Sequence, residues 1–233
     1  MLQCSTKTQV SKAIKQKTPF IITKLASLNL SNLSIAEDHC KVLGAAIRRN
    51  TTLTSLDLHD NRIDHLACKP LCEAMSQNST LKHLDLSNNR IDTAACEYIS
   101  EALKENWTLT SLDLGNNRID ADSCKLLAEA LKDNQSLTYL NLYDNRIDGK
   151  ACQWLGEAIK QNLSLSRLGL GNNRIDLEGC IYLGEAINHT KALTSLDLHD
   201  NRIDIEGYKV LTEAIKNNPI LKHLDVRDNR FKN

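Results

Sequence analysis

Leucines recur along this chain at fixed places in a short polar and apolar pattern. The stretch that starts at Leu53 reads LTSLDLHDNRID, in which Leu56 and Leu58 flank the polar Asp57. An alternation with period two predicts a short strand with its leucines facing the core. The same stretch restarts every 28 residues, at Leu25, Leu53, Leu81, Leu109, Leu137, Leu165, Leu193 and Leu221.

The second half of each unit has helical spacing instead. Leu71, Ala74 and Met75 stand at i, i+3 and i+4, which predicts an amphipathic helix with a narrow apolar face. Each unit therefore predicts one strand and one helix. No unit can bury its apolar side alone, so we expect the units to be stable only when stacked.

The shared pattern L-x-x-L-x-L-x-x-N-x-I resembles the leucine-rich repeat family. The 28-residue period and the following L-x-x-A-[LIM]-x-x-N stretch are similar to its ribonuclease-inhibitor-like subclass, which includes the repeat arrays of NOD-like receptors. The resemblance implies an α/β fold, a right-handed solenoid (horseshoe) of about eight units. A parallel β-sheet would line its concave face and α-helices its convex face. The leucine-rich repeat domain would span residues 25–233.

Residues 1–24 lie outside the repeat register and predict an N-terminal capping segment. Val10, Ala13 and Ile14 have helical spacing, Pro19 would end that helix, and the apolar residues 20–22 would cover the first layer. The last unit ends in a charged stretch, which is either a charged cap or the end of a truncated array. Its charged residues are Lys222, His223, Asp225, Arg227, Asp228, Arg230 and Lys232.

Other residue types repeat in columns with the same period. Asn61 and its equivalents predict an asparagine column bonded to the backbone of adjacent turns. Asn50 and its equivalents predict helix ends in the left-handed conformation. Arg62 and Asp64, with their equivalents, predict a ladder of ion pairs between units.

Six of the eight cysteines form another such column. Cys40, Cys68, Cys96, Cys124, Cys152 and Cys180 are 28 residues apart, which predicts a row of small buried thiols rather than a disulfide framework. A reducing compartment suits free thiols. The N-terminus has no apolar run of signal-peptide length, so we expect a cytoplasmic location.

Composition excludes two classes of partner. The chain has 29 Lys and Arg against 29 Asp and Glu, a formal net charge of zero. Binding to nucleic acid or to acidic membranes usually requires a basic excess, so we expect neither. We also find no signal for a cofactor and none for an oligomer, and expect a monomer.

The third, fifth and seventh residues of each unit should point out of the concave face. At the fifth position Asp57, Asp85 and Asp113 follow one another, and Asp197 continues the column later. Like charges on neighbouring strands repel each other. Two interpretations stay open: the aspartates bond to neighbouring hydroxyls as part of the repeat, or they form an acidic stripe for Lys or Arg of a partner.

The fifth and sixth units break the pattern. Tyr139 and Tyr143 project from one strand and Arg167 from the next. Tyr and Arg are enriched among residues that dominate binding energy. These side chains, with Asn141 between them and Gly169 and Gly171 beside them, predict an aromatic ridge next to a pocket at the centre of a partner-binding site.

Metal binding and catalysis are not expected. His59 and His83 occupy the seventh and third positions, four strand residues apart or on the order of 13 Å, too far for one ion. The sequence shows no nucleophile paired with a base, and a flat sheet offers neither an oxyanion hole nor a pocket that excludes water.

The sequence therefore predicts a non-catalytic module that binds a partner protein on its concave face. Uniform units without a catalytic domain resemble the repeat effectors that intracellular bacterial pathogens deliver into host cells, which implies a host protein as partner and the host cytoplasm as location. Two alternatives remain. One is a GTPase-activating protein resembling the Ran activator, although that family has less regular repeats and an acidic tail. The other is a sensor fragment of a NOD-like receptor.

Overall fold

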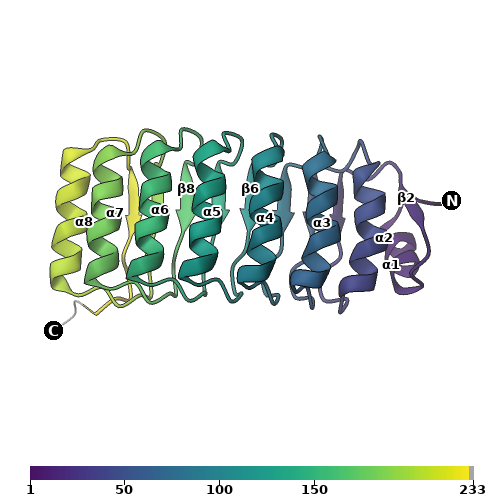
Figure 1. The fold of residues 1–233 in the computed structure, drawn as a ribbon, viewed down its shortest axis with the longest axis horizontal. Coiled ribbons are helices and arrows are strands. Elements are labelled where there is room, and N and C mark those ends of the chain that lie inside the picture. Colours follow the sequence, from purple (N-terminus) through teal and green to yellow (C-terminus); the bar gives the residue numbers. More distant parts are fainter. Residues whose placement is uncertain (231–233) are drawn as a thin grey trace.

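The computed structural model describes residues 1–230 and shows one strand–helix unit repeated side by side (Figure 1). The helices form one layer and the strands a second layer behind it. Residues 231–233 are not described, so Lys232 of the charged C-terminal stretch lies outside the described residues. No helix in residues 1–230 is long and apolar enough to cross a bilayer.

The strand layer is a parallel sheet in which every unit contributes three residues. Its order is β10-β9-β8-β7-β6-β5-β4-β3, so each strand pairs with its neighbours in the sequence. Leu56 pairs with Leu28 on one side and Leu84 on the other, a shift of 28 positions each time. The strands are β3 (Ser27–Asn29), β4 (Ser55–Asp57), β5 (His83–Asp85), β6 (Ser111–Asp113), β7 (Tyr139–Asn141), β8 (Arg167–Gly169), β9 (Ser195–Asp197) and β10 (His223–Asp225).

The helix layer follows the same order. Seven residues separate each strand from the helix that follows it, and each helix forms the crossover between two neighbouring parallel strands. The helices of the repeats are α2 (Glu37–Arg48), α3 (His65–Gln77), α4 (Thr93–Glu105), α5 (Ala121–Asp133), α6 (Gly149–Gln161), α7 (Leu177–His189) and α8 (Ile205–Asn217). The predicted solenoid of alternating strands and helices is confirmed.

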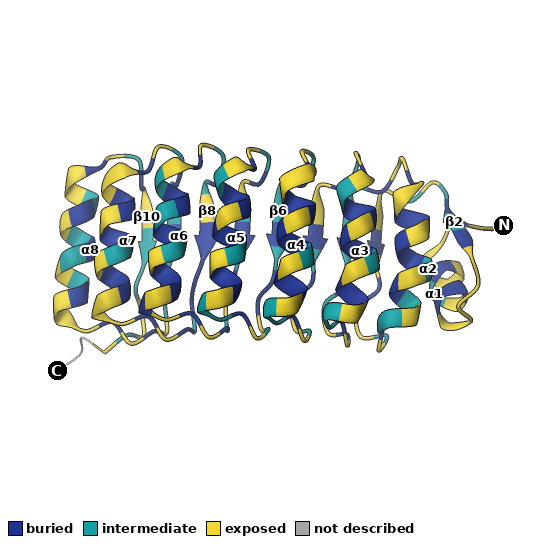
Figure 2. Ribbon diagram, in the orientation of Figure 1, coloured by how far each residue is buried: buried dark blue, intermediate teal, exposed yellow. Residues whose placement is uncertain are grey.

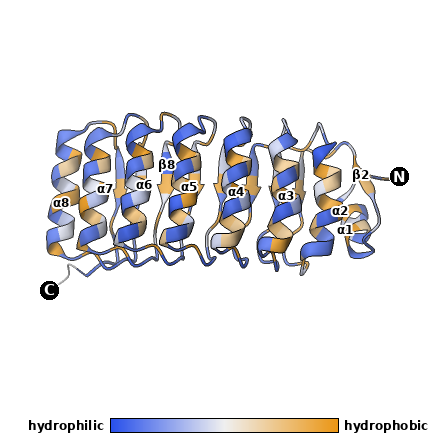
Figure 3. Ribbon diagram, viewed as in Figure 1, coloured by the Kyte–Doolittle hydropathy of each residue, from blue (hydrophilic) through white to orange (hydrophobic). Residues whose placement is uncertain are grey.

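The core lies between the two layers. Three leucines of one unit show this: Leu112 of β6, Leu114 directly after β6 and Leu127 of α5 are fully buried. Figure 2 shows a buried stripe along the inner side of each helix and an exposed outer side. Hydropathy follows the same division, with hydrophobic residues on the strands and on the inner helix faces (Figure 3).

The N-terminal segment folds into a small unit of its own. Helix α1 (Lys7–Lys15) buries Val10, Ala13 and Ile14. Strand β1 (Leu2–Cys4) pairs in parallel with β2 (Phe20–Ile22), which the sequence did not predict. The helix ends at Lys15, before the predicted breaker Pro19, because Lys17 already adopts a left-handed conformation with φ of 51°.

The predicted asparagine column at the turn after each strand is confirmed. Asn61 donates through Nδ2 to the carbonyls of Leu30 and Leu58, at 3.1 and 2.9 Å. Its Oδ1 accepts from the backbone N–H groups of Leu33 and Ile35. One largely buried side chain thus joins two adjacent units.

The second asparagine column closes most of the helices, as predicted, but not in the predicted left-handed conformation. Asn134 has φ of −71° and ψ of 121°, an extended conformation, and is fully buried. Its side chain bonds to the preceding unit, with Nδ2 donating to the carbonyls of Leu103 and Asn106 at 2.8 and 2.9 Å. The equivalents of Asn134 are Asn50, Asn78, Asn106, Asn162 and Asn218, with Thr190 in the seventh unit.

The left-handed conformation occurs elsewhere in the unit, in the turn directly after the strand. Asp60 has φ of 53° and Asn88 has φ of 54°. Asn and Asp tolerate this conformation better than other non-glycine residues. The other residues of this column are Asn32, Asn116, Asp144, Asn172, Asp200 and Asp228.

The predicted ion-pair ladder of arginines and aspartates is wrong. The aspartates cap the helices instead: Asp64 accepts from the backbone N–H of Ala67, and Asp120 from that of Ser123. The arginine column, from Arg62 to Arg230, is exposed. Within residues 1–230 no ion pair joins the two columns. The free N–H groups in the first turn of a helix need acceptors. The aspartate carboxylates accept from these N–H groups rather than pairing with the arginines.

Asp120→Ala is expected to lower the free energy of unfolding by about 1–2 kcal/mol, the usual value of an N-cap. Asp120 accepts from Ser123 N, Ser123 Oγ and Thr93 Oγ1. Burial disfavours its charged form, but these hydrogen bonds outweigh burial and lower its pKa. The stabilisation is therefore present at neutral pH and is lost as the pH falls through the lowered pKa.

Urea denaturation at pH 7 and at strongly acidic pH tests this expectation. The matched control is Asp122→Ala, because Asp122 is exposed in the first turn of the same helix. We expect that control to change stability by at most about 0.5 kcal/mol. An equal loss in both variants, or a loss at Asp120 that persists in acid, would contradict the capping role.

The cysteine column is buried, as predicted. Cys40, Cys68 and Cys96 are each 0% exposed and carry free thiols. Burial raises the pKa of the Cys40 and Cys96 thiols far above the ordinary value, and a hydrogen bond with Cys72 together with burial does so for Cys68. A neutral thiol packed between units acts as a small apolar side chain.

Candidate functional site

The face of the sheet that points away from the helices presents the third, fifth and seventh residues of every unit. We call this the open face. Its residues belong to strands fixed on both sides by backbone pairing, so neighbouring side chains stand about 5 Å apart in register. The open face is therefore a rigid array of side chains on a regular grid.

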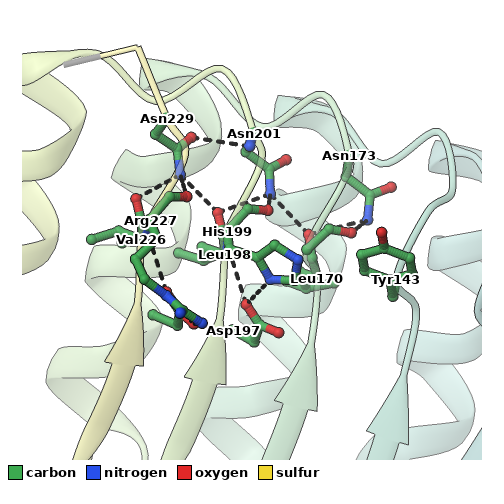
Figure 4. Close-up of polar contacts among 12 residues, drawn as sticks. Tyr143, Leu170, Asn173, Asp197, Leu198, His199, Asn201, Val226, Arg227 and Asn229 are labelled. Carbon is green, nitrogen blue, oxygen red and sulfur yellow. Dashed lines mark hydrogen bonds and ion pairs between the residues drawn. The ribbon is translucent and has the colours of Figure 1, made fainter. Parts of the chain in front are cut away.

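Two aromatic contacts mark the fifth to seventh units. The guanidinium carbon of Arg167 lies 5.0 Å from the centre of the Tyr139 ring, a cation–π contact. The Tyr143 ring stacks on the His199 ring, with centroids 5.5 Å apart and an interplanar angle of 24° (Figure 4). The second contact joins units five and seven across the unit between them.

The two glycines beside these rings are covered by neighbouring side chains. A Cβ atom on Gly171 would meet the His199 ring at 2.5 Å, and one on Gly169 would meet Asn141 Oδ1 at the same distance. Both glycines are buried under these side chains. Glycine at position 171 thus gives His199 the room to reach Tyr143.

A hollow remains over Gly169. It is lined by Tyr139, Asn141, Tyr143, Arg167, Leu168, Gly169, Ser195 and Asp197. All the predicted ridge residues line it except Gly171. The structure adds Leu168 and Ser195, and brings in Asp197 from the acidic column. Arg167 and Asp197 bring opposite charges to its rim, while Tyr139 and Tyr143 provide aromatic surface. Burial and the nearby Asp113 raise the pKa of the Tyr139 hydroxyl, so it remains protonated.

The acidic column is partly engaged within the chain. Asp57, Asp85 and Asp113 lie in register on β4, β5 and β6. Each accepts a hydrogen bond from the backbone N–H two residues further on, at 2.8 to 3.0 Å. Burial raises the pKa of Asp113, although bonds from Asn141 and Gly115 oppose this.

The predicted hydrogen bond from a neighbouring hydroxyl is present at one of these three aspartates. Ser87 Oγ donates to Asp85 at 2.6 Å, whereas Asn141 and Asn29 donate to Asp113 and Asp57. No lysine or arginine in residues 1–230 forms an ion pair with the three aspartates. These contacts are compatible with both predicted roles of the aspartates: hydrogen bonding within the repeat, and an acidic stripe for Lys or Arg of a partner.

The histidines group with aspartates rather than with each other. Ligand atoms of Asp57, His59 and Asp85 all lie within 4.8 Å of one another. A second group of the same residue types comprises Asp197, His199 and Asp225. The expectation against a metal rested on the separation of His59 from His83, whereas each group combines one histidine with two aspartates. A histidine two residues after an aspartate, with another aspartate 28 residues later, was the available signal.

The comparisons with known proteins agree with this fold. The family model described as Leucine Rich repeat matches residues 49–72, 77–100, 105–128 and 133–153. These segments are leucine-rich repeats, and the same unit continues in register on both sides of them. The chain thus folds as a solenoid similar to that of leucine-rich repeat proteins, and the matched repeats support a role as a protein-interaction module.

Two solved structures show the same architecture. An internalin C2 from Listeria monocytogenes str. 4b F2365 is 20% identical with a TM-score of 0.57, over 98% of this chain and 77% of the internalin. Leiomodin-1 Actin-Binding Site 2 is 24% identical with a TM-score of 0.51, over 60% of this chain and 80% of leiomodin. At these identities the likeness concerns the fold. No curated protein sequence matches the chain.

Proposed function

We propose that this chain is a non-catalytic module that binds one partner protein through its open face, as a monomer. The observation that carries the proposal is the cluster of Tyr139, Tyr143 and Arg167 around the hollow over Gly169. Half-exposed aromatic rings on a rigid sheet provide contact area at low entropic cost. Asn141 and Asp197 add polar groups that would fix the partner's orientation.

The acidic stripe of Asp57, Asp85 and Asp113 extends the proposed site toward the N-terminal units. Its carboxylates have no cationic partner among the described residues other than His59. Basic side chains of a partner would find an unneutralised surface there. Such charges increase association rates and select against acidic partners.

The proposed setting is that of a bacterial effector that acts on host proteins in the host cytoplasm. Two features support it: the uniform 28-residue units, and a shared architecture with a Listeria internalin. Leiomodin-1 uses the same architecture for an actin-binding site, which supports protein recognition as the role of the solenoid. The ribonuclease-inhibitor-like subclass, indicated by the 28-residue period, is part of the proposal.

Replacing the aromatic centre is expected to weaken partner binding at least tenfold, because a few aromatic and arginine residues usually carry most of the affinity. The variant is Tyr139→Ala, Tyr143→Ala, Arg167→Glu. The native chain and the variant are compared by affinity capture from eukaryotic cell lysate, and captured proteins are then titrated individually.

The matched control changes the same kinds of residue on another surface: Trp107→Ala, Leu163→Ala, Lys191→Glu. These side chains are exposed on the loops before the strands. A partner that the control retains and the open-face variant loses supports the proposal. Equal capture by both variants places binding elsewhere. A small GTPase whose hydrolysis accelerates with the native chain would favour the activator function instead.

A further inference from the structure

Two groups of potential metal ligands stand on the open face. They arise because residues 53–64 and 193–204 have the same sequence, LTSLDLHDNRID, and the strand after each begins with LKHLD. In both groups His Nδ1 lies against the aspartate of its own strand, at 2.8 Å for His59 and 2.6 Å for His199. The third ligand comes from the next strand, Asp85 or Asp225. The proposed partner-binding function uses Asp197 in the hollow and Asp57 and Asp85 in the acidic stripe, but it gives no role to His59 or His199.

We propose that Asp57, His59 and Asp85 form a binding site for a divalent transition-metal ion, with zinc as the best match. Imidazole nitrogen and carboxylate oxygen are ligands that zinc accepts at about 2.0–2.2 Å. Three protein ligands leave the fourth position for water. The three ligand atoms already lie within 4.8 Å of one another, so small side-chain movements would bring them onto a shared ion.

The ligands are already oriented by neighbouring groups. Asn29 Nδ2 donates to Asp57 Oδ2, and Ser87 Oγ donates to Asp85 Oδ1 at 2.6 Å. Such hydrogen bonds fix carboxylates in metal sites. The ion takes the place of the proton between His59 Nδ1 and Asp57. A neutral His59 ring then carries its proton on Nε2, and a protonated ring releases its Nδ1 proton to solvent.

The second group should bind the ion less tightly. Arg227 Nε donates to both oxygens of Asp225, at 2.9 and 3.0 Å, and its guanidinium forms an ion pair with the same carboxylate. The His199 ring is also held against Tyr143 (Figure 4). An ion there would have to displace a cation and move a stacked ring. Ser87 stands where Arg227 stands, so the first group has no such competitor.

The free thiols do not compete for the ion. The described cysteines are all buried, and burial raises the pKa values of those in the column. A thiol must lose its proton to bind zinc. Zinc bound by the folded chain is therefore assigned to the open face.

The experiment titrates Zn²⁺ alone into the metal-free, reduced, full chain at neutral pH, in competition with a chromophoric chelator. We expect one tighter site and one at least tenfold weaker. His59→Gln and Asp85→Asn should each weaken the tighter site at least tenfold. His83→Gln is the matched control, because His83 is exposed on β5 outside the group, and it should leave both sites unchanged.

A second variant tests the role of the arginine. Arg227→Ser makes the second group resemble the first and should strengthen the weaker site at least threefold. Far-UV circular dichroism checks that each variant is folded. The proposal is overturned if the native chain binds no zinc, or if His83→Gln loses as much affinity as His59→Gln. An unchanged weaker site in Arg227→Ser overturns the assignment of the second group.

Discussion

Asn134→Ala should lower the free energy of unfolding by about 3 kcal/mol, a large effect for a polar residue. Its side chain satisfies two carbonyls of the preceding unit, Leu103 and Asn106, and the buried N–H of Leu137. Asn134 is 0% exposed, so water cannot replace these bonds. Each buried group left without a partner costs about 1–3 kcal/mol. Alanine leaves the Leu103 carbonyl and the Leu137 N–H without one, whereas the Asn106 carbonyl keeps a bond from Ser136 Oγ.

Urea denaturation followed by far-UV circular dichroism measures this loss. Asn188→Ala is the control, since Asn188 is exposed near the end of α7 and should change stability by at most about 0.5 kcal/mol. If Asn134→Ala behaved like the control, the column would not hold adjacent units together.

Leu140→Ala should cost about 3 kcal/mol for a different physical reason. Leu140 is the middle residue of β7 and is 0% exposed between the two layers. The change removes buried methyl groups and leaves a cavity that the paired strands cannot close, because their register is fixed on both sides. Buried Leu→Ala changes cost about 2–5 kcal/mol.

Leu163→Ala removes the same atoms from a side chain that is 62% exposed in the loop before β8. The same urea experiment should show a change below about 0.5 kcal/mol for this control. Comparable losses at Leu140 and Leu163 would mean that the sheet does not hold the core in place.

The strands, the helices and the buried leucines could be predicted because one period of 28 residues repeats them many times. The asparagine column at Asn61 was predictable for a related reason: a polar residue in a leucine pattern must bond to the backbone. The columns of Asn134 and Asp64 were misinterpreted. Residue type alone does not tell whether a side chain caps its own helix or reaches the neighbouring unit.

The candidate site was predictable only in part. Register placed Tyr139, Tyr143 and Arg167 on one face, because side chains alternate along a strand. The stacking of Tyr143 on His199 could not be inferred, since it skips one unit and depends on the missing side chain of Gly171. The Asp57–His59–Asp85 group required comparing different positions of adjacent units rather than the same position along a column.

Each strand residue pairs in register with the residue 28 positions later, so equivalent side chains on the open face are evenly spaced from unit to unit. Inserting or removing one whole unit would shift every later side chain by one strand spacing, about 5 Å, and would leave its orientation unchanged. The separation between the acidic stripe and the aromatic centre can therefore change only in whole steps. Recombination between these similar units would adjust the reach of the chain to a partner without redesigning any single contact.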